Sequence, residues 1–406
     1  MAIERSTLAL RGTAVVTFLM LIAAGCGVTD SESSSAAPPV AEPPRTDLTS
    51  TSELPTTTRR ATTTTSSTST TSSTTTSTTT TSSTSTTLPA PTTTLEPLPN
   101  PDLPATNAAF ELLASRNAAV SMTVLRDGVA VFARASGKTI DGAEATSDSP
   151  MVVASVSKLI TGLAVARLHE QGLIDVDAQV PWALLWVVPD PAWSDVMIRE
   201  LLTHTSGMPV VRTSWFDGSG DCASFLPHLV DRPPAAYRGR WTYSNGNYCA
   251  LGLLVERITG LPLDQAVQQL VFDPVGATGV HLTVNGEFPT DVSHAPGIAR
   301  LSRLGGAGTF IVSTDDLATA VDATTVADRE VMSWPGIITD QYGWGHTGTV
   351  SGAKSCAWML ELGRTTIVAT VAGNSPDKGG AVCDIIVPAI AADLNVPGGR
   401  PNRTPP

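Results

Sequence analysis

Basic residues and long apolar runs are both scarce in this chain. Its 406 residues include 25 lysines and arginines against 37 aspartates and glutamates, which gives a net charge of −12. No basic patch or arginine-rich helix offsets this balance, and we therefore expect no nucleic-acid partner. The apolar run near the N-terminus, at about residues 14–24, is shorter than the roughly 18–20 residues that a membrane-spanning helix needs. It is therefore not predicted to span a membrane.

Two signatures of hydrolytic chemistry are also missing. No histidine and cysteine spacing typical of a zinc site occurs, and no Gly-x-Ser-x-Gly sequence marks the nucleophile turn of an ordinary lipase. We therefore expect neither a metal nor a cofactor. Any catalysis has to come from other side chains.

The first 25 residues predict a secretory signal. Arg5 and Arg11 precede the apolar run, which ends in Ile-Ala-Ala-Gly-Cys at residues 22–26. This ending resembles a bacterial lipobox, whose cysteine is lipidated and becomes the first residue of the mature protein. We expect export, with a lipid on Cys26 holding the chain to the cell membrane and the rest reaching into the cell wall. The alternative is an ordinary cleaved signal with an incidental cysteine.

Residues 26–103 predict a disordered linker that begins with the lipobox cysteine. They consist mainly of Ser, Thr and Pro, and residues 62–87 are almost entirely Ser and Thr. Such a segment has nothing to bury and cannot offset the entropy of becoming ordered. As a flexible coil it would span about 50 Å. Its composition resembles an O-glycosylated stalk, and an unmodified spacer is the alternative.

Residues 104–396 predict one folded domain of α+β class, followed by a flexible tail at 397–406. A helix is expected at 108–115, then a hairpin of strands at 120–125 and 129–133 around Arg-Asp-Gly. Two more strands, at 357–362 and 366–372, and a helix at 380–393 lie near the C-terminus. Strands at both ends with helices between them predict an antiparallel sheet completed by both termini, with a helical lobe.

Four of the five cysteines lie in the predicted domain. An exported protein meets an oxidising environment, which favours disulfides. Four cysteines allow three pairings. Pairing neighbours, Cys222 with Cys249 and Cys356 with Cys383, closes two moderate loops that would each contribute roughly 3–4 kcal/mol. Buried free thiols are the alternative.

Ser155 and Lys158, in the sequence Ser-Val-Ser-Lys, form a candidate nucleophile and proton partner. The same Ser-x-x-Lys pattern recurs at Ser351 and Ser375, but in turn and loop sequence, whereas Ser155 opens an apolar helical pattern. A lysine one turn after the serine lies on the same helix face. Burial would lower its pKa and let it act as a base. The alternative is a helix N-cap serine with a solvated lysine.

Tyr243 and Asn245 stand at a loop-to-helix junction, in Trp-Thr-Tyr-Ser-Asn-Gly at 241–246. A side chain at such a junction can point into a cleft. A nearby cation would lower the pKa of the phenol, which could then exchange a proton with Ser155. The Asn245 amide could contact a substrate carbonyl and steady Lys158. The alternative is a core tyrosine followed by an Asn cap.

His346 opens the third candidate motif, which lies in the glycine-rich segment 343–352. Gly348 allows a close approach to the backbone. An exposed strand edge here could pair with an extended substrate, and a backbone N–H could serve an oxyanion hole. The hydroxyls of Thr347 and Thr349 could hold a substrate carboxylate. The alternative is a glycine-rich turn with a surface histidine.

Together these motifs resemble the serine β-lactamase-related family, which contains class C β-lactamases, D-alanyl-D-alanine carboxypeptidases and related esterases. Three further segments stand in the order found in that family: Leu-Leu-Thr-His-Thr-Ser-Gly-Met at 201–208, Phe-Asp-Pro-Val-Gly at 272–276 and Ser-Thr-Asp-Asp-Leu at 313–317. The resemblance covers about residues 105–395. It implies a β-lactamase/transpeptidase-like fold and a peptidoglycan-type peptide or a β-lactam as substrate.

The resemblance also implies roles for single residues. Ser155 would be the acylated nucleophile, Lys158 its proton partner, and Tyr243 a general base and then acid. Which of Lys158 and Tyr243 is the acylating base stays open. Backbone N–H groups of Ser155 and Thr349 would form the oxyanion hole. Substrate contacts are implied for Asn245, His346, Thr347, Gly348 and Thr349.

His346 departs from the lysine found at this position in typical class C β-lactamases. Histidine here resembles certain carboxypeptidases and esterases of the family. The sequence therefore favours an exported D-alanyl-D-alanine carboxypeptidase-like enzyme with a serine acyl-enzyme. A β-lactamase or esterase of the same fold, and an inactive wall-binding module, are the alternatives. His204 is expected to be structural, shaping the turn before Gly207.

Overall fold

A computed structural model describes the folded part of the chain, at residues 102–211, 220–277, 279–282, 291–292, 298–333, 337–373 and 379–398. The predicted signal, Cys26, the linker up to residue 101, Ser375 and the tail from residue 399 lie outside the described residues. Helices and antiparallel strands are mixed, which confirms the α+β prediction.

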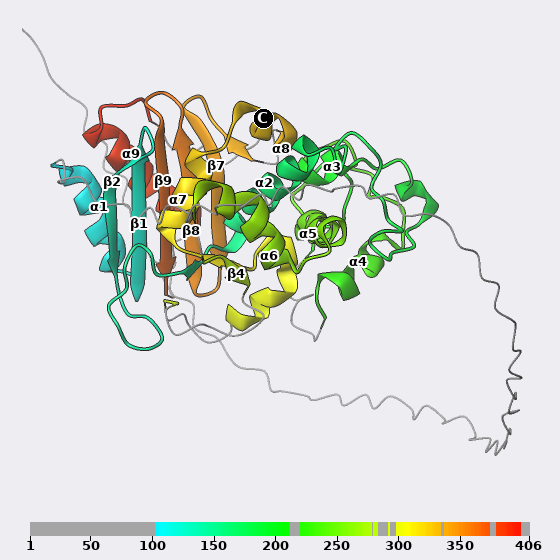
Figure 1. The fold of residues 1–406 in the computed structure, drawn as a ribbon, viewed down its shortest axis with the longest axis horizontal. Coiled ribbons are helices and arrows are strands. Elements are labelled where there is room, and N and C mark those ends of the chain that lie inside the picture. The colour runs from blue at the N-terminus through cyan, green and yellow to red at the C-terminus, as the bar shows by residue number, and fades with distance from the viewer. Residues whose placement is uncertain are drawn as a thin grey trace, which may run out of the picture. The chain divides into compact units, whose positions relative to one another are not determined.

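The main sheet of the described part has six antiparallel strands in the order β2-β1-β9-β8-β7-β6 (Figure 1). Strands from both ends of the fold meet at its centre, because β1 pairs with β9. Asp127 and Gly128, both at positive φ, form the tight β1–β2 turn. The strands are β1 (Ala119–Arg126), β2 (Val129–Ser136), β6 (Ile338–Thr339), β7 (Gly343–Val350), β8 (Ala353–Leu360) and β9 (Thr365–Ala372).

Two helices from opposite ends of the fold cover one face of this sheet (Figure 1). They are α1 (Pro104–Ala114) and α9 (Gly379–Asp393). Between them and the sheet lies a buried apolar cluster that includes Phe110, Trp358 and Ile386. A disulfide between Cys356 and Cys383 ties β8 to α9 within that cluster.

A larger set of helices packs on the other face of the sheet (Figure 1). Among them α2 is buried almost all round, not on one side only as its apolar periodicity suggests. The helices are α2 (Ser157–Glu170), α3 (Ile198–Leu202), α4 (Cys222–Val230), α5 (Asn245–Thr259), α6 (Leu263–Val267), α7 (Thr314–Asp322) and α8 (Val326–Met332), with a π-helical turn at Gln268–Phe272 and 3-10 segments at Pro191–Trp193, Asp273–Val275 and Ile298–Ala307.

A small three-stranded sheet, in the order β3-β5-β4, leads the chain into α2. Its strands are β3 (Met151–Val152), β4 (His281–Leu282) and β5 (Phe310–Val312). A single 3-10 turn, η1 (Ala154–Val156), connects β3 to α2 and contacts β7 of the main sheet. This connection places η1 between the sheet and the helices.

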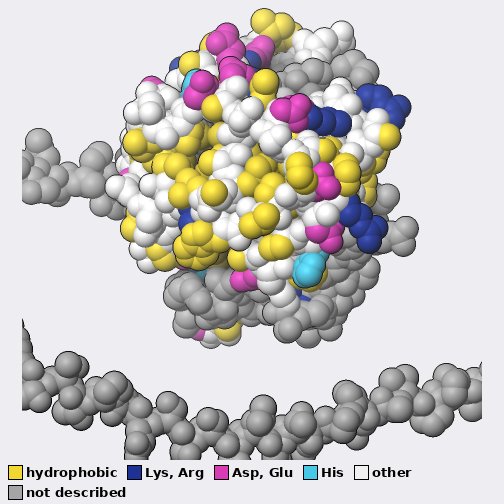
Figure 2. All heavy atoms as spheres, turned by 90° about the vertical axis from the view of Figure 1, so that its right-hand side faces the viewer, with side chains coloured by type: hydrophobic (Ala, Val, Ile, Leu, Met, Phe, Trp, Pro, Cys, Tyr) yellow, Lys and Arg dark blue, Asp and Glu magenta, His cyan; other side chains and the backbone are white. Residues whose placement is uncertain are grey.

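The surface on the helical side carries many apolar side chains (Figure 2). Trp186 and Val188 are among the exposed apolar residues of the described chain, and the Arg257 guanidinium lies 3.7 Å from the Trp186 ring centroid. None of the helices in the described part is long and apolar enough to cross a membrane.

Candidate active site

Ser155 lies in the 3-10 turn η1, directly before α2. It is partly exposed, although its neighbours Ala154 and Val156 are fully buried. Ala154 adopts a φ of +49°, a strained conformation for a residue with a side chain. The cap position of α2 is Val156, with no side-chain hydrogen bond to the helix end. Ser155 is therefore not the N-cap of α2, and its hydroxyl is available for chemistry.

Lys158 is completely buried and points at Ser155. Its Nζ lies 3.3 Å from Ser155 Oγ, and it donates to Asn245 Oδ1 at 2.8 Å and to the Ala307 carbonyl at 2.5 Å. Burial holds the pKa of Lys158 well below its usual 10.5, because the charged ammonium loses its hydration there. The structure therefore excludes a solvated lysine. The neutral form of the buried amine is far easier to reach by loss of a proton than that of a surface lysine.

Tyr243 reaches the same serine from the loop before α5. Its hydroxyl donates to Ser155 Oγ at 2.9 Å, and Lys158 Nζ lies 4.8 Å from its ring centroid. Ser244, not Asn245, caps α5, because its side chain accepts from the Gly246 N–H at 3.1 Å. The Asn245 side chain therefore does not cap the helix, and its Oδ1 accepts a hydrogen bond from Lys158.

The electrostatic prediction for Tyr243 is wrong. The nearby cation was expected to lower the pKa of the phenol, but burial raises it to about 12, with the Ser155 hydrogen bond as the smaller, opposing effect. Desolvation of the phenolate is the larger effect, and the pKa of Lys158 is itself depressed by burial. Tyr243 is therefore a protonated hydrogen-bond donor in this site.

Strand β7 brings the third motif beside η1. The short strand β6 pairs with β7 only at Trp344 and Gly345, so that among the described strands only β8 pairs with the stretch that follows. A Cβ on Gly348 would lie 2.5 Å from the Val153 carbonyl and 2.2 Å from Ser355 Oγ. The Ser355 hydroxyl also donates to that carbonyl at 2.5 Å. Glycine at 348 is therefore required for β7 and the nucleophile segment to lie this close.

His346 is buried on the sheet face that carries the helical lobe, which excludes a surface histidine. Nδ1 lies 2.7 Å from the Thr347 carbonyl. Burial, with the Lys158 charge adding to it, lowers the pKa of His346 to about 4. The imidazole is therefore neutral at ordinary pH and provides no positive charge for a substrate carboxylate.

Thr347 and Thr349 occupy the other side-chain register of β7. Thr347 is paired with Cys356, whose side chain belongs to the cluster under α9, whereas His346 is paired with Ala357 in the opposite cluster. Thr349 Oγ1 accepts from the Gly379 N–H at 2.6 Å. Strand alternation thus separates both hydroxyls from the face that carries His346. Their contacts to a substrate remain predictions.

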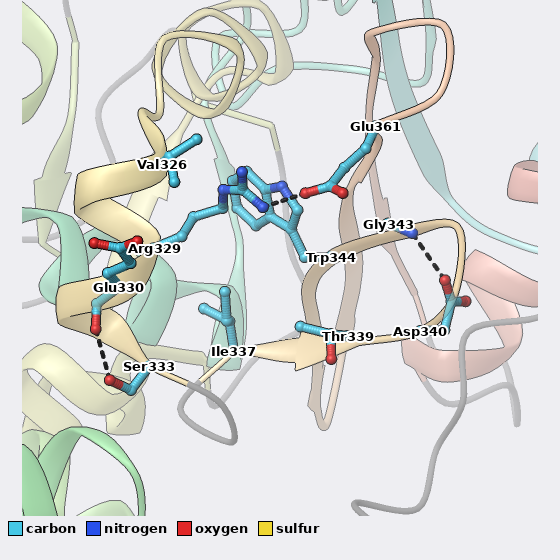
Figure 3. A pocket seen from close by; sticks show the side chains of 10 residues that line it. All are labelled: Val326, Arg329, Glu330, Ser333, Ile337, Thr339, Asp340, Gly343, Trp344 and Glu361. Carbon is cyan, nitrogen blue, oxygen red and sulfur yellow. Dashed lines mark hydrogen bonds and ion pairs between the residues drawn. The ribbon is translucent and has the colours of Figure 1, made fainter.

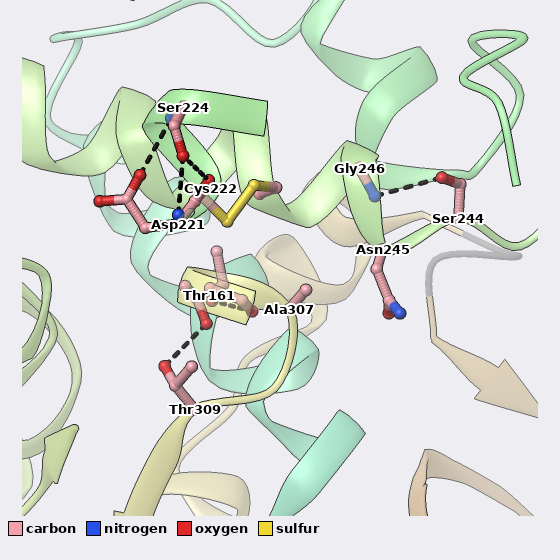
Figure 4. Close-up of a disulfide and its surroundings, with 12 residues drawn as sticks. Thr161, Asp221, Cys222, Ser224, Ser244, Asn245, Gly246, Ala307 and Thr309 are labelled. Carbon is pink, nitrogen blue, oxygen red and sulfur yellow. Dashed lines mark hydrogen bonds between the residues drawn. A yellow bond between two sulfur atoms is a disulfide. The ribbon is translucent and has the colours of Figure 1, made fainter. Parts of the chain in front are cut away.

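One partner of Lys158 escaped the sequence reasoning, because it is a backbone atom. The Ala307 carbonyl lies in Gly-Gly-Ala-Gly at 305–308, and the glycine content was the only available signal of a close approach. Gly305 packs against the Cys222–Cys249 disulfide, because a Cβ on it would lie 2.8 Å from Cys222 Sγ. Figure 4 shows this disulfide together with Ala307. The disulfide thus supports the turn that holds the lysine.

A separate groove of about 600 Å³ lies between α8, β6 and the start of β7 (Figure 3). Arg329 crosses it, with its guanidinium 5.7 Å from the Trp344 ring centroid and an ion pair to Glu361. Its lining includes none of the residues around Ser155. Within the described part of the chain no cluster of His, Cys, Asp or Glu could hold a metal ion.

The fold and the site together define the class of β-lactamase and penicillin-binding folds. Two terminal helices cover one face of an antiparallel sheet. On its other face a partly exposed serine, a buried lysine and a phenol converge at one point. Residues 107–391 match the Beta-lactamase family. The chain belongs to this family.

Individual relatives are distant and match only part of their length. A putative D-alanyl-D-alanine carboxypeptidase of Escherichia coli (strain K12) is 25% identical over 185 residues, 39% of this chain and 42% of the relative. Esterase EstB of Burkholderia gladioli is 34% identical over 177 residues, 38% of this chain and 44% of the relative. The chain spans less than half the length of these curated relatives.

A solved structure shows the same fold at lower sequence identity. The D-amino acid amidase of Ochrobactrum anthropi SV3, in complex with D-phenylalanine, is 18% identical with a TM-score of 0.59, covering 72% of this chain and 98% of that one. At this identity the likeness concerns the fold alone.

Proposed function

We propose that this protein is an exported serine hydrolase that acts on D-alanyl-D-alanine-type peptides through an acyl-enzyme on Ser155. One observation carries the proposal. Tyr243 and Lys158 approach the same hydroxyl, at 2.9 and 3.3 Å, from different elements of the fold. A nucleophile flanked by two proton-exchanging groups is the arrangement that acyl transfer needs.

The depressed pKa of Lys158 and the raised pKa of Tyr243 favour Lys158 as the acylating base. A neutral amine has two N–H donors, which bind Asn245 Oδ1 and the Ala307 carbonyl. Its lone pair is then free to accept the Ser155 proton. The phenol meanwhile donates to Ser155 Oγ. Each polar atom of the group has a partner in this protonation state.

In the acylation step Ser155 Oγ forms a bond to the substrate carbonyl carbon, and its proton passes to Lys158. The C–N bond of the terminal D-alanine then breaks, and Tyr243 gives its proton to the leaving amine. The proton held by Lys158 restores the phenol. A water molecule repeats the sequence in reverse to release the acid and free Ser155.

The substrate assignment draws on the wall-directed features of the sequence. The predicted signal, lipid anchor on Cys26 and long tether would hold the domain near peptidoglycan, and a relative bears the name putative D-alanyl-D-alanine carboxypeptidase. The edge of β7 beyond Gly345 offers backbone groups to an extended peptide.

An ester is the second candidate substrate, and His346 favours it. With the imidazole neutral above its pKa of about 4, this position gives no ion pair to the carboxylate of a peptide or a β-lactam. A neutral ester has no carboxylate and needs no such ion pair, and EstB is among the relatives.

The test of the acyl-enzyme uses fluorescent penicillin and an activated nitrophenyl ester. The wild-type protein should gain the mass of the acyl group from at least one reagent, and Ser155→Ala should gain none. Equal labelling of Ser155→Ala would refute Ser155 as the nucleophile. No acyl-enzyme from either reagent would favour a wall-binding module without turnover.

The substrate class is then decided by comparing three turnovers on the wild-type enzyme. A D-alanyl-D-alanine peptide that releases D-alanine faster than the other substrates react supports the carboxypeptidase. Faster hydrolysis of a chromogenic cephalosporin indicates a β-lactamase, and faster cleavage of a short-chain nitrophenyl ester indicates an esterase.

A further inference from the structure

His204 lies directly behind Tyr243, in a position that the mechanism above does not use. It follows α3 and is only 2% exposed. Its ring centroid is 4.7 Å from that of Tyr243 and 5.2 Å from that of Tyr248. The imidazole therefore forms part of the wall against which the phenol rests.

The imidazole also binds the backbone that carries Tyr243. Nδ1 accepts from the Ser244 N–H at 3.3 Å and lies 3.0 Å from Asn247 Nδ2. The Asn247 side chain is oriented by Ser206, whose hydroxyl donates to Asn247 Oδ1 at 2.6 Å. Because a backbone N–H can only donate, Nδ1 must be the acceptor and the proton of the neutral ring is on Nε2.

The backbone of His204 makes a third connection to the same loop. Its carbonyl accepts from the Thr242 N–H at 2.8 Å, so that residues on both sides of Tyr243 are fixed to one residue. His204 itself has a φ of +57°, which is costly for a residue with a side chain. Its Nε2 is buried without a hydrogen-bond partner among the described residues. A residue needed only for packing would require neither feature.

We propose that His204 is a positioning residue for Tyr243, which holds the phenol on Ser155 by its ring contact and by its bonds to Thr242 and Ser244. The proposal rests on the proposed function, because it assigns His204 a role through Tyr243. It goes beyond the structural turn expected from the sequence.

The environment of His204 keeps the ring in the form that this role needs. Burial, which strips the imidazolium of its hydration, holds the pKa of His204 well below 6.5. Tyr243 and Tyr248, the other titratable groups against the ring, have pKa values raised by burial. Protonation would remove the acceptor at Nδ1 and release the Ser244 N–H.

Three substitutions of His204 separate the effect of the Nδ1 hydrogen-bond acceptor from the effect of the ring contact. His204→Asn places an amide oxygen near the position of Nδ1 and tolerates positive φ. His204→Phe keeps a ring and loses the acceptor, and His204→Gln places its polar atom near Nε2 instead. We expect the acylation rate constant, measured as the burst of nitrophenol from a nitrophenyl ester, to fall about 10- to 100-fold in His204→Phe and His204→Gln, and less than about 10-fold in His204→Asn.

A double-mutant cycle with Tyr243→Phe gives the readout that a purely structural role would not move. If His204 acts through the phenol, His204→Gln, which alone should cost about 10- to 100-fold, should lower the burst rate by less than about twofold once the hydroxyl is absent. The exposed His228, changed to Asn, serves as the control and should leave the rate unchanged. Thermal unfolding of each variant shows whether the rates refer to folded protein.

If every His204 variant gave a burst at the wild-type rate, the inference would be overturned and the proposed function would stay intact. A loss in His204→Gln that persists undiminished in the Tyr243→Phe background, or a loss that follows the drop in unfolding temperature, would also overturn it. If the wild-type protein gives no burst, or if Ser155→Ala gives the same burst as the wild type, the proposed function is overturned and the inference with it.

Discussion

The candidate site depends at the residue scale on one buried amine. Lys158 is surrounded by oxygen atoms of Ser155, Asn245 and Ala307 and has no access to solvent. Loss of hydration on burial disfavours the ammonium relative to the neutral amine and so makes a lysine reactive. The same burial makes the residue expensive for the fold, which gives a direct test of its role.

Replacing Lys158 should separate activity from stability. We expect Lys158→Met to lower the acylation rate about a thousandfold, because no base remains near Ser155. The same variant should be more stable by about 0.5–2 kcal/mol, because a buried polar head is replaced by an apolar one. Burst kinetics and chemical denaturation measure the two effects. Lys158→Arg keeps a charge that cannot be removed, and its retention of full activity would contradict the role of Lys158 as base.

The pH dependence follows from the same residue. Lys158 has a lowered pKa, so that its basic form is lost as the pH falls through that pKa and is present above it. We therefore expect kcat/KM to rise with pH to a plateau reached well below 10.5. Tyr243, with a pKa of about 12, stays protonated on that plateau. A profile of ester hydrolysis from about pH 5 to about pH 10 tests this expectation.

His346 provides the control for this profile. Its pKa of about 4 places its titration below the pH range of this profile. His346→Asn should therefore leave the midpoint of the rising limb unchanged. A midpoint that disappears in this variant would assign the titration to the imidazole instead of the amine.

Residue types were easier to predict than their electrostatics. Ser155, Lys158 and Tyr243 could be selected from motif order, and the structure brings the three together. The pKa of Tyr243 could not be predicted correctly, because it depends on which distant segments exclude water from the ring. The contact between Lys158 and the Ala307 carbonyl was likewise hidden, since any residue type supplies a backbone oxygen.

At the scale of elements, the register of β7 against η1 positions the nucleophile. Gly348→Ala should disturb this contact, because the added methyl group would overlap with Ser355 Oγ and the Val153 carbonyl. We expect a loss of about 1–3 kcal/mol in stability. The acylation rate of the folded protein should fall as well, because the displaced segment carries Ser155.

Gly345→Ala is a matched control on the same strand. A Cβ there would lie 2.0 Å from the Ala357 carbonyl, a comparable clash without contact to Val153 or Ala154 among its three closest atoms. Its acylation rate, corrected for the folded fraction by circular dichroism, should fall less than that of Gly348→Ala. Equal losses would show that β7 has no specific role in placing Ser155.

The two disulfides form a second matched pair. Both Cys222–Cys249 and Cys356–Cys383 close loops with a sequence separation of 27. On the chain-entropy account each contributes about 3.5 kcal/mol. Only Cys222–Cys249 touches the Gly305 turn whose neighbour Ala307 binds Lys158.

Serine replacements should therefore give similar losses of stability and different losses of activity. The doubly substituted variant of Cys222 and Cys249 should show a slower burst per folded molecule, and that of Cys356 and Cys383 should not. Thermal unfolding and burst kinetics, measured on the same samples, check both expectations. A larger kinetic defect in the Cys356 and Cys383 variant would contradict the link between the Cys222–Cys249 disulfide and the site.

Regular elements were predictable where their periodicity was local. The hairpin of β1 and β2, the pair β8 and β9 and the helix α9 lie within a few residues of the expected ranges. The two-residue strands β3, β4 and β6 gave no sequence signal, because they exist only through pairing with distant partners. The burial of α2 on all sides was hidden for the same reason.

At the scale of the whole molecule, the candidate site and the features that predict export belong to separate parts of the chain. Every atom of the candidate site lies within the described residues, between η1 and β7. The features that predict export and anchoring lie before residue 104. Activity and attachment to the membrane should therefore be lost independently of each other.

Cys26 and Ser155 test this independence in opposite directions. In cells fed a labelled fatty acid, Cys26→Ala should incorporate no label, because the lipid-bearing thiol is absent, while the purified variant keeps the acylation rate of the wild type. Ser155→Ala should keep the fatty-acid label and lose the burst. Incorporation of label by Cys26→Ala would place the lipid elsewhere, and absence of label from the wild type would indicate an ordinary cleaved signal. A slower burst in Cys26→Ala would instead mean that the anchor segment contributes to the site, which the packing of Ser155, Lys158 and Tyr243 within the folded domain does not require.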